Sequence, residues 1–471
     1  MKYISTRGNV SEIGFIDAVL MGLATDGGLL VPESIPQIPA EKLAEMSKLS
    51  YEELAYKIIS YYVDGEISEN ELKELIKKSY GTFRHPEVTP IQKVKDNMYV
   101  LELFHGPTFA FKDVALQFLG NLYSYIAQKK GVTINILGAT SGDTGASAIE
   151  GVRGKEGIRI CILHPHGKVS KVQELQMTTV DDESVLNLAI EGTFDDGQRI
   201  IKELFADLEF KNKYHLRAIN SINFARILAQ TVYYFYAYFQ VAKEKNINSL
   251  NFSVPTGNFG DIFAGYLAKR MGLPVGKLIV ATNENNILER FIKDGVYQPS
   301  EFRSTYSPSM DIQVASNFER YLYYLLDENS SAVTSLMEQF KSEGKIIVDE
   351  DKLCQVQGDF SAHGVTGDEC LQTIKNYFAK TDYLLDPHTS CGVAAYEVCN
   401  EATETCVTLA TAHPAKFNES IERCDIEQTF PKEIQQLFEK PQYLEVVAAE
   451  NDAIARKLEK HFQSTVNENV R

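Results

Sequence analysis

Short apolar runs alternate with helical stretches over most of the chain from residue 98 onward. The runs MYVLELF, VTINILGA and IRICILHP are each followed by residues with helical spacing, and SVLNLAIEG, NSLNFSVP and KLIVATN repeat the arrangement. Continuously apolar strands alternating with helices are typical of parallel βαβ units whose sheet is covered on both faces. The pattern therefore predicts an α/β fold with open, mainly parallel sheets.

The two ends of the chain differ from this centre. Leu, Ile, Glu and Lys recur at helical spacing in SYEELAYKIISYYVDGEISENELKELIKKSY, and the last residues are charged with helical spacing. We predict a mainly helical amino-terminal unit (1–97), a smaller α/β domain (98–220), a larger α/β domain (221–440) and a helical carboxy-terminal tail (441–471).

One strand leads into a glycine-containing turn and a helix in NFSVPTGNFGDIFAGYLAKR. Gly257 and Gly260 allow the backbone to approach a ligand, and the N–H groups at a helix start favour a phosphate. The turn matches neither GxGxxG nor GxxxxGK[ST]. A plain helix start with Asp261 as its cap therefore stays open as the alternative.

A second strand and helix meet at the turn in INILGATSGDTGASAIEG. The turn gathers hydroxyl groups and backbone donors at a helix start, from Thr140, Ser141, Gly142, Asp143 and Thr144. Ligands of open α/β sheets bind at the carboxyl ends of strands, and these donors suit a carboxylate. A capped helix without a ligand is the alternative.

A lysine stands among phenylalanines in FHGPTFAFKD. An apolar environment lowers the pKa of an amine and frees it to form a Schiff base with an aldehyde, and Phe104, Phe109 and Phe111 are candidates to surround Lys112. The alternative is a lysine whose stem covers apolar surface while its ammonium reaches water.

A possible anion clamp lies in NSINFARIL. Ser221, Asn223 and Arg226 combine hydroxyl, amide and guanidinium donors at a predicted helix start, although a solvated arginine would explain the same residues. A Schiff-base lysine, a phosphate turn and a carboxylate turn are together what pyridoxal phosphate and an amino acid require.

Composition narrows the possible partners. The 471 residues carry a formal charge of −17, which disfavours nucleic acid and anionic membranes and requires local cations for an anionic substrate. No signal sequence or membrane span is visible, and seven scattered cysteines without a CxxC pair suit reduced thiols. We expect a cytoplasmic enzyme without a metal site.

The motifs FHGPTFAFKD, GATSGDTGASA, NSINFARI, PTGNFGD and LATAHPAKF, with MKYISTRG and LATDGGLLVPE before them, resemble the threonine synthase family. The resemblance extends from about residue 1 to about residue 420 and is to the longer form of the family. It implies the tryptophan synthase β-like fold (fold type II) and pyridoxal 5'-phosphate as cofactor.

The resemblance also implies roles for individual residues. Lys112 is similar to the catalytic lysine that holds the cofactor, and Thr411 is similar to the hydroxyl residue that faces the pyridine nitrogen. Further cofactor contacts are expected from Phe111, Asp143, Gly257, Asn258, Phe259, Gly260 and Asp261. Substrate contacts are expected from Thr140, Ser141, Gly142, Thr144, Ser221, Asn223 and Arg226. Many relatives of this fold have Asn in place of Asp143.

The implied activity is conversion of O-phospho-L-homoserine and water to L-threonine and phosphate by γ-elimination and β-addition. We expect a monomer or homodimer without a nucleic acid or membrane partner. Three alternatives stay open from the sequence: another fold type II lyase or dehydratase, a silent metabolite-binding protein, and a generic phosphate-binding α/β domain.

Overall fold

The computed structural model describes residues 1–140 and 142–463. The chain divides into two compact units, one made of Met1–Ala115 and Ser221–Gln428, the other of Leu116–Asn220 and Thr429–Arg471. The sequence pattern places residues 98–115 in the smaller domain, whereas in the structure they belong to the first unit. The reason is that β4 (Met98–Glu102) pairs with β14 (Cys406–Ala410).

The described residues of the first unit form a sheet with the strand order β13-β10-β9-β14-β4-β3. All neighbours are parallel except β3, which is antiparallel to β4. Every residue of β9 and β14 is buried, so both faces of the sheet are covered, as predicted. The remaining strands are β3 (Ile91–Lys95), β9 (Leu250–Pro255), β10 (Val275–Thr282) and β13 (Phe360–Gly364).

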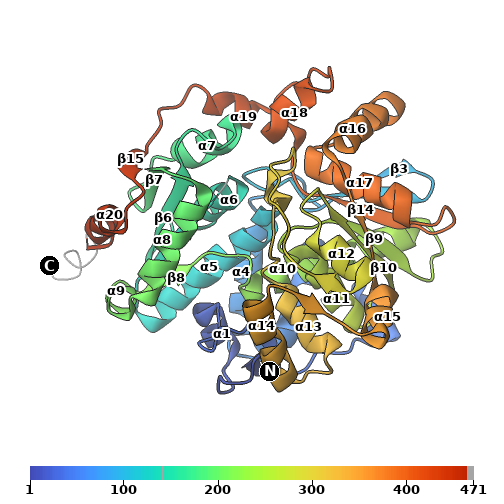
Figure 1. The fold of residues 1–471 in the computed structure, drawn as a ribbon, viewed down its shortest axis with the longest axis horizontal. Coiled ribbons are helices and arrows are strands. Elements are labelled where there is room, and N and C mark those ends of the chain that lie inside the picture. Colours follow the sequence, from blue (N-terminus) through green and yellow to red (C-terminus); the bar gives the residue numbers. More distant parts are fainter. Residues whose placement is uncertain (141, 464–471) are drawn as a thin grey trace. The chain divides into compact units, whose positions relative to one another are not determined.

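Helices surround this sheet (Figure 1). They are α10 (Phe224–Glu244), α11 (Gly260–Arg270), α12 (Ile287–Asp294), α13 (Phe318–Leu325), α14 (Ser330–Glu343), α15 (Glu350–Asp359), α16 (Gly367–Thr381), α17 (Pro387–Cys399) and α18 (Asn418–Glu422). Short 3-10 turns, η1 (Pro308–Met310) and η2 (Pro414–Phe417), and a small antiparallel pair, β11 (Val296–Tyr297) with β12 (Ile346–Ile347), complete this part.

Helices make up most of the regular structure of the first 80 residues, within the unit predicted for 1–97. A short antiparallel pair, β1 (Tyr3–Ser5) and β2 (Leu30–Pro32), accompanies α1 (Phe15–Met21), α2 (Ala40–Met46), α3 (Tyr51–Val63) and α4 (Glu69–Tyr80). Capping boxes at Ser50 and Ser68 explain where α3 and α4 begin, because each serine and the glutamate three residues later satisfy each other's backbone N–H groups.

The second unit has its own sheet, whose described strands are all parallel and lie in the order β15-β7-β6-β5-β8. The strands are β5 (Ile134–Ala139), β6 (Ile158–Pro165), β7 (Val185–Glu191), β8 (Leu216–Ala218) and β15 (Glu445–Ala448). The helices are α5 (Lys112–Lys130), which begins in the first unit, α6 (Asp143–Val152), α7 (Lys171–Thr178), α8 (Phe194–Ala206), α9 (Leu208–Lys213), α19 (Lys432–Leu437) and α20 (Asn451–Gln463).

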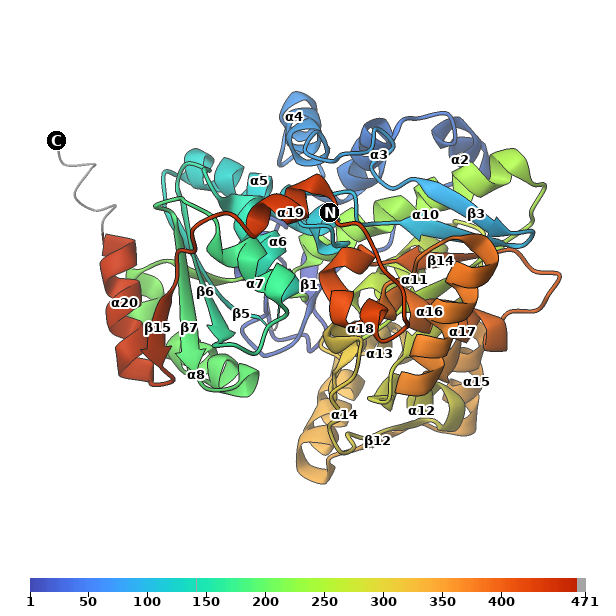
Figure 2. The same cartoon turned by 90° about the horizontal axis from the view of Figure 1, so that it is seen from above.

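The predicted helical tail from residue 441 contains a strand as well as a helix. The tail contributes the edge strand β15 before α20 begins, and Figure 2 shows the strand beside β7. Only Val447 of β15 is buried, so the strand lacks the continuous apolar run that predicted the others.

Within 1–140 and 142–463, no helix has the length and apolarity needed to cross a membrane, and no group of His, Cys, Asp and Glu side chains could hold a metal ion. All seven cysteines are free thiols.

Candidate active site

Lys112 is the first residue of α5 and follows a tightly closed turn. The carboxylate of Asp113 accepts hydrogen bonds from the backbone N–H and the hydroxyl of Thr108, both at 2.7 Å. Phe109 has the left-handed backbone conformation, with φ of 59°, which is costly for a phenylalanine and persists only when its surroundings enforce it. The turn therefore fixes the backbone position of Lys112.

The phenylalanines of this stretch have different neighbours. The amine of Lys112, which is half-buried, lies 5.7 Å from the ring centre of Phe111. Phe104 and Phe109 pack edge-on against His413, with ring centres 5.5 and 5.6 Å from it. Burial lowers the pKa of His413 to about 4, so this ring is neutral near pH 7. Among the predicted phenylalanines, Phe111 is the one shown beside the amine.

The segment after β14 runs alongside this turn. The backbone N–H of Phe111 donates to the carbonyl of Thr411 at 2.8 Å, and the N–H of His413 donates to the carbonyl of Phe109 at 3.0 Å. The ammonium of Lys416 donates to the carbonyl of Thr108 at 2.7 Å. The structure therefore brings Thr411 next to the predicted lysine, and Lys416 braces the turn.

The predicted phosphate turn lies between β9 and α11. Phe259 precedes the helix in the left-handed conformation, with φ of 62°, and no side chain caps the helix start. Gly257 packs against η1, where an added Cβ would lie 2.9 Å from the carbonyl oxygen of Ser309. Because β9 and β14 are parallel neighbours, this turn and Thr411 lie at the same edge of the sheet. An uncapped helix start suits an anion.

The side chain of Asp261 belongs to the protein core. Its carboxylate accepts hydrogen bonds from the hydroxyls of Tyr233, at 2.5 Å, and Tyr234, at 2.9 Å. Burial raises the pKa of Asp261 to about 6. Any contribution of Asp261 to the phosphate turn must therefore come from its backbone.

The predicted anion clamp surrounds the start of α10. Asn223 caps the helix by accepting from the N–H of Ala225 at 3.1 Å, and its amide donates to the carbonyl of Val19 at 2.8 Å. Arg226 lies in the first turn and is buried. The hydroxyls of Ser221 and Ser316 are 2.9 Å apart. Asn223 therefore shapes this segment, while Arg226 supplies its charge.

The carboxylate turn belongs to the second unit. The hydroxyl oxygen of Thr140 accepts from the N–H groups of Gly142 and Gly145, both at 3.0 Å. The buried carboxylate of Asp143 accepts from the amide of Gln173 at 2.8 Å. Thr144 is half-buried in the first turn of α6, whereas Ser141 lies outside the described residues. Thr140 thus holds the turn in shape.

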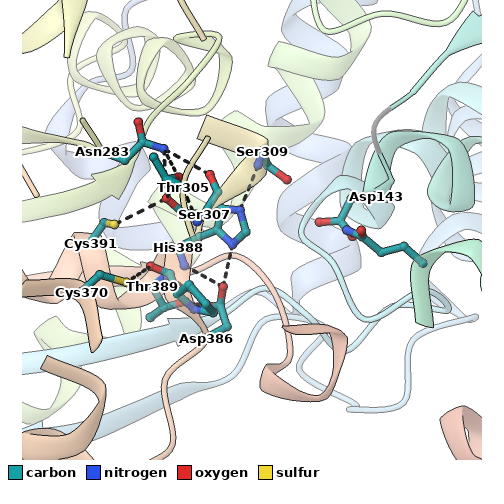
Figure 3. A network of polar contacts seen from close by, with 12 residues as sticks. Asp143, Asn283, Thr305, Ser307, Ser309, Cys370, Asp386, His388, Thr389 and Cys391 are labelled. Atoms are coloured by element: carbon teal, nitrogen blue, oxygen red, sulfur yellow. Dashed lines mark hydrogen bonds and ion pairs between the residues drawn. The ribbon is translucent and has the colours of Figure 1, made fainter. Parts of the chain in front are cut away.

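A polar network near η1 was missed by sequence reasoning (Figure 3). The ring of His388 is joined to Asp386 through Nδ1 at 2.9 Å, and Nε2 accepts from the N–H of Ser309 at 3.1 Å. The amide of Asn283 donates to Ser307 Oγ at 3.0 Å. These contacts hold η1, which packs against Gly257. The motif DPHTS signals only a helix start, because Asp386 caps α17 and Pro387 follows it.

Comparison with known proteins shows the family of the chain. Three family models match successive parts of the chain: the threonine synthase N terminus at residues 2–80, pyridoxal-phosphate dependent enzyme at 83–411, and the threonine synthase C-terminal model at 389–457.

A threonine synthase from Pseudomonas aeruginosa is 46% identical, with 96% of each chain covered. The chain belongs to the threonine synthase family. One from Schizosaccharomyces pombe is also 46% identical and covers 89% of this chain and 88% of its own. The crystal structure of a pyridoxal phosphate-bound threonine synthase from Brucella melitensis has 43% identity and a TM-score of 0.95, covering 98% of this chain and 100% of its own.

Membership of the threonine synthase family confirms the predicted fold type II and makes the chain a pyridoxal phosphate-dependent enzyme. The residues of the first unit fit that cofactor. An amine stands beside an aromatic ring at Lys112, a hydroxyl residue follows β14 at Thr411, and an uncapped helix start at Phe259 and Gly260 suits a phosphate group.

Proposed function

We propose that the chain converts O-phospho-L-homoserine and water to L-threonine and phosphate. The observation that carries the proposal is the hydrogen bond between Phe111 and Thr411, which joins the predicted catalytic lysine's turn to the predicted pyridine-facing hydroxyl residue. In a member of the threonine synthase family, we take this arrangement to place the amine of Lys112 for successive proton transfers.

Several residues would hold the cofactor. We assign its aldehyde to Lys112, its phosphate to the backbone of residues 257–261, and its pyridine nitrogen to Thr411. When bound, pyridoxal phosphate supplies an electron sink for charge that develops on the substrate carbons. A hydroxyl stabilises a protonated pyridine less than a carboxylate does, so Lys112 carries more of the proton transfer.

Lys112 acts as the base throughout the proposed reaction. Its amine removes the α proton, passes that proton on, and then removes a β proton, which allows the γ phosphate to leave. The γ carbon must then gain a proton to become the methyl group of threonine, and we assign this delivery to the same amine. Water adds its hydroxyl to the β carbon, the amine returns a proton to the α carbon, and the remaining proton of the water leaves with the phosphate. The ring of Phe111 lies beside this amine, whose nitrogen is 5.7 Å from the ring centre.

Two segments would bind the anionic ends of the substrate. We assign the phosphate to Ser221 and Arg226 at the start of α10, within a segment shaped by Asn223, and the carboxylate to the residues of the 140–144 turn. Holding both ends restricts the reacting bonds to a productive orientation. In a chain of net charge −17, the buried guanidinium of Arg226 supplies the local positive charge that an anionic substrate requires.

The experiment is an absorption spectrum of the purified enzyme before and after addition of O-phosphohomoserine, with phosphate, threonine and 2-oxobutyrate measured in parallel. We expect stoichiometric phosphate and threonine. Lys112→Ala should lose the visible cofactor band and the activity, whereas Lys78→Ala, an exposed lysine paired with Glu74, should keep both. Release of 2-oxobutyrate in place of threonine would identify a phospho-lyase instead.

We also propose that the enzyme works in the cytoplasm as a monomer or homodimer. Seven free cysteines, five of them buried, suit a reducing compartment. Light scattering of the purified enzyme tests the oligomeric state.

A further inference from the structure

A buried arginine joins three distant segments of the first unit. Arg320 in α13 has no exposed surface, and burial lowers the pKa of its guanidinium to about 10, so it is charged at neutral pH. Nε and Nη2 donate to the carbonyl of Leu30 at 3.1 and 3.0 Å. Nη2 also donates to the carbonyl of Ile222 at 2.5 Å. A buried charge is tolerated only when its donors are satisfied, so these carbonyls are held firmly.

The fourth contact of Arg320 orients Asn317. Nη1 donates to Asn317 Oδ1 at 2.5 Å, and because a guanidinium only donates, the amide oxygen must face it. The amide nitrogen of Asn317 consequently faces two carbonyl oxygens, that of Ser221 at 3.2 Å and that of Asn258 at 3.1 Å. The backbone N–H of Asn317 donates to the same Asn258 carbonyl at 3.0 Å.

These contacts decide which way the peptide N–H groups of both segments point. In a planar trans peptide the C=O and the following N–H point in opposite directions. The carbonyl of Asn258 faces Asn317, so the N–H of Phe259 points away from it. The carbonyls of Ser221 and Ile222 face Asn317 and Arg320, which directs the next two N–H groups of that segment away from them.

Ser316 links the same two segments through side chains. Its hydroxyl lies 2.9 Å from that of Ser221 and donates to the amide oxygen of Asn258 at 3.0 Å. The phosphate turn and the start of α10 are therefore joined twice by consecutive residues, once through main-chain carbonyls and once through side chains.

We propose that Arg320 and Asn317 are positioning residues that set the peptide orientation of the cofactor-phosphate turn and of the substrate-phosphate segment together. The proposal rests on the proposed function, which supplies the two anions. Arg320 is needed for the forked geometry of its donors and not only for its charge. Asn317 is needed for its amide N–H donor and not only for its size.

The chain offers a matched control in the same region. Arg7 pairs with Glu319, the neighbour of Arg320 in α13, at 2.8 and 3.0 Å, and so also ties the amino-terminal segment to this helix. Its other hydrogen bonds are with Ser5 and Thr334. Arg7→Met therefore removes a comparable link without disturbing the carbonyls of Ser221, Ile222 and Asn258.

The decisive variant is Asn317→Asp, which keeps an acceptor for Arg320 but replaces the donor with an oxygen facing two carbonyls. Equilibrium dialysis of the holoenzyme against decreasing pyridoxal phosphate should give a dissociation constant at least tenfold higher than that of the unsubstituted enzyme. The KM for O-phosphohomoserine should rise by more than kcat falls, and the Ki of inorganic phosphate should rise with it. Arg320→Lys should change the same constants in the same direction.

Arg7→Met should leave all three constants within twofold, whatever it does to the melting temperature. Cofactor affinity and KM unchanged in both Asn317→Asp and Arg320→Lys would overturn the proposal, as would equal changes in Arg7→Met. If Asn317→Asp does not fold, Ser316→Ala, at a half-buried position, tests the side-chain link with the same measurements. An unsubstituted enzyme that binds the cofactor but makes no threonine would instead refute the proposed function, and dialysis would still test the positioning role.

Discussion

At the scale of single residues, Asp261 gives the protein a defined dependence on pH. Its carboxyl is buried against Tyr233 and Tyr234, and burial raises the pKa to about 6 from an ordinary value of 3.8. A group whose pKa is raised by folding stabilises the folded state below its ordinary pKa, and that contribution is lost as pH rises to about 6.

The free energy of unfolding of Asp261→Asn should therefore increase relative to that of the unsubstituted enzyme as pH rises. The difference in free energy of unfolding between the two proteins should shift by about 2 kcal/mol toward the variant between pH 4 and pH 7, on the scale of 1.36 kcal/mol for each pKa unit. Urea unfolding at both values measures it, and the comparison cancels the other titrating groups. A difference that does not change with pH would contradict the raised pKa.

Residue types indicate which groups meet in the candidate site, but they do not show how each side chain is used. Lys112, Phe111 and Thr411 come together as the motifs indicated. Asn223 and Thr140 carry suitable donors, but these groups also cap and close their own turns, which a linear sequence cannot separate from ligand binding. The roles assigned to the individual site residues therefore stay predictions.

At the scale of elements, the packing of η1 against the phosphate turn predicts a sensitive glycine. Gly257→Ala places a methyl group 2.9 Å from the carbonyl of Ser309 and 3.1 Å from the Cα of Met310, so the turn must move. We expect a roughly tenfold loss of cofactor affinity, about 1.4 kcal/mol. Equilibrium dialysis measures it. Gly358→Ala, where the added Cβ meets nothing within 4 Å, is the control and should leave the affinity unchanged.

The crossing of α5 and α6 predicts a larger effect on stability. An added Cβ at Gly120 would lie 1.8 Å from the carbonyl oxygen of Gly151, so the two helix backbones could not keep their separation. Gly120→Ala should lower the free energy of unfolding by about 3 kcal/mol or more, at the upper end for overpacked cores. Urea unfolding beside Gly358→Ala measures it, and equal midpoints would show that the helices separate at little cost.

Elements were predictable where their signal was local. Strands β9 and β14 are buried along their whole length because both faces of their sheet are covered, and the starts of α3 and α4 carry recognisable capping boxes. The segment 300–317 gave no such signal, since hydrogen bonds among distant residues hold it. The sequence does not distinguish Arg320 for the same reason: in NFERYLYYLL it resembles any charged residue of an amphipathic helix.

At the scale of the whole molecule, the enzyme and its proposed substrate are both negatively charged. The chain carries −17, and O-phosphohomoserine is an anion, so its attraction must arise from buried cations and backbone donors near the proposed site. Arg226 and Arg320 are both buried, and such charges are screened by salt much less than surface charges are.

The KM for this substrate should therefore change less than threefold between 20 and 200 mM salt at constant pH, about one order of magnitude in ionic strength. Steady-state kinetics test this, and a tenfold rise would indicate that surface charge governs binding.

The carboxy-terminal residues should be essential to the second unit although they lie far from Lys112 in sequence. β15 pairs with the edge of β7, and Ile454, Leu458 and Phe462 of α20 are buried in the core that contains strand residues of that unit. Exposing three such side chains costs roughly 5 to 9 kcal/mol at 1.5 to 3 kcal/mol each. A whole domain has a stability of only about 5 to 15 kcal/mol.

Removal of residues 441–471 should therefore leave the second unit unfolded or the protein insoluble, and the enzyme should lose activity with it. Soluble yield and urea unfolding monitored by circular dichroism measure the outcome. The matched control is removal of residues 464–471 alone, which leaves β15 and the three buried side chains in place and should keep the unfolding midpoint. If the longer truncation stayed soluble with an unchanged midpoint, the edge strand and its helix would be dispensable, and the sheet formed by β5 to β8 would be stable without them.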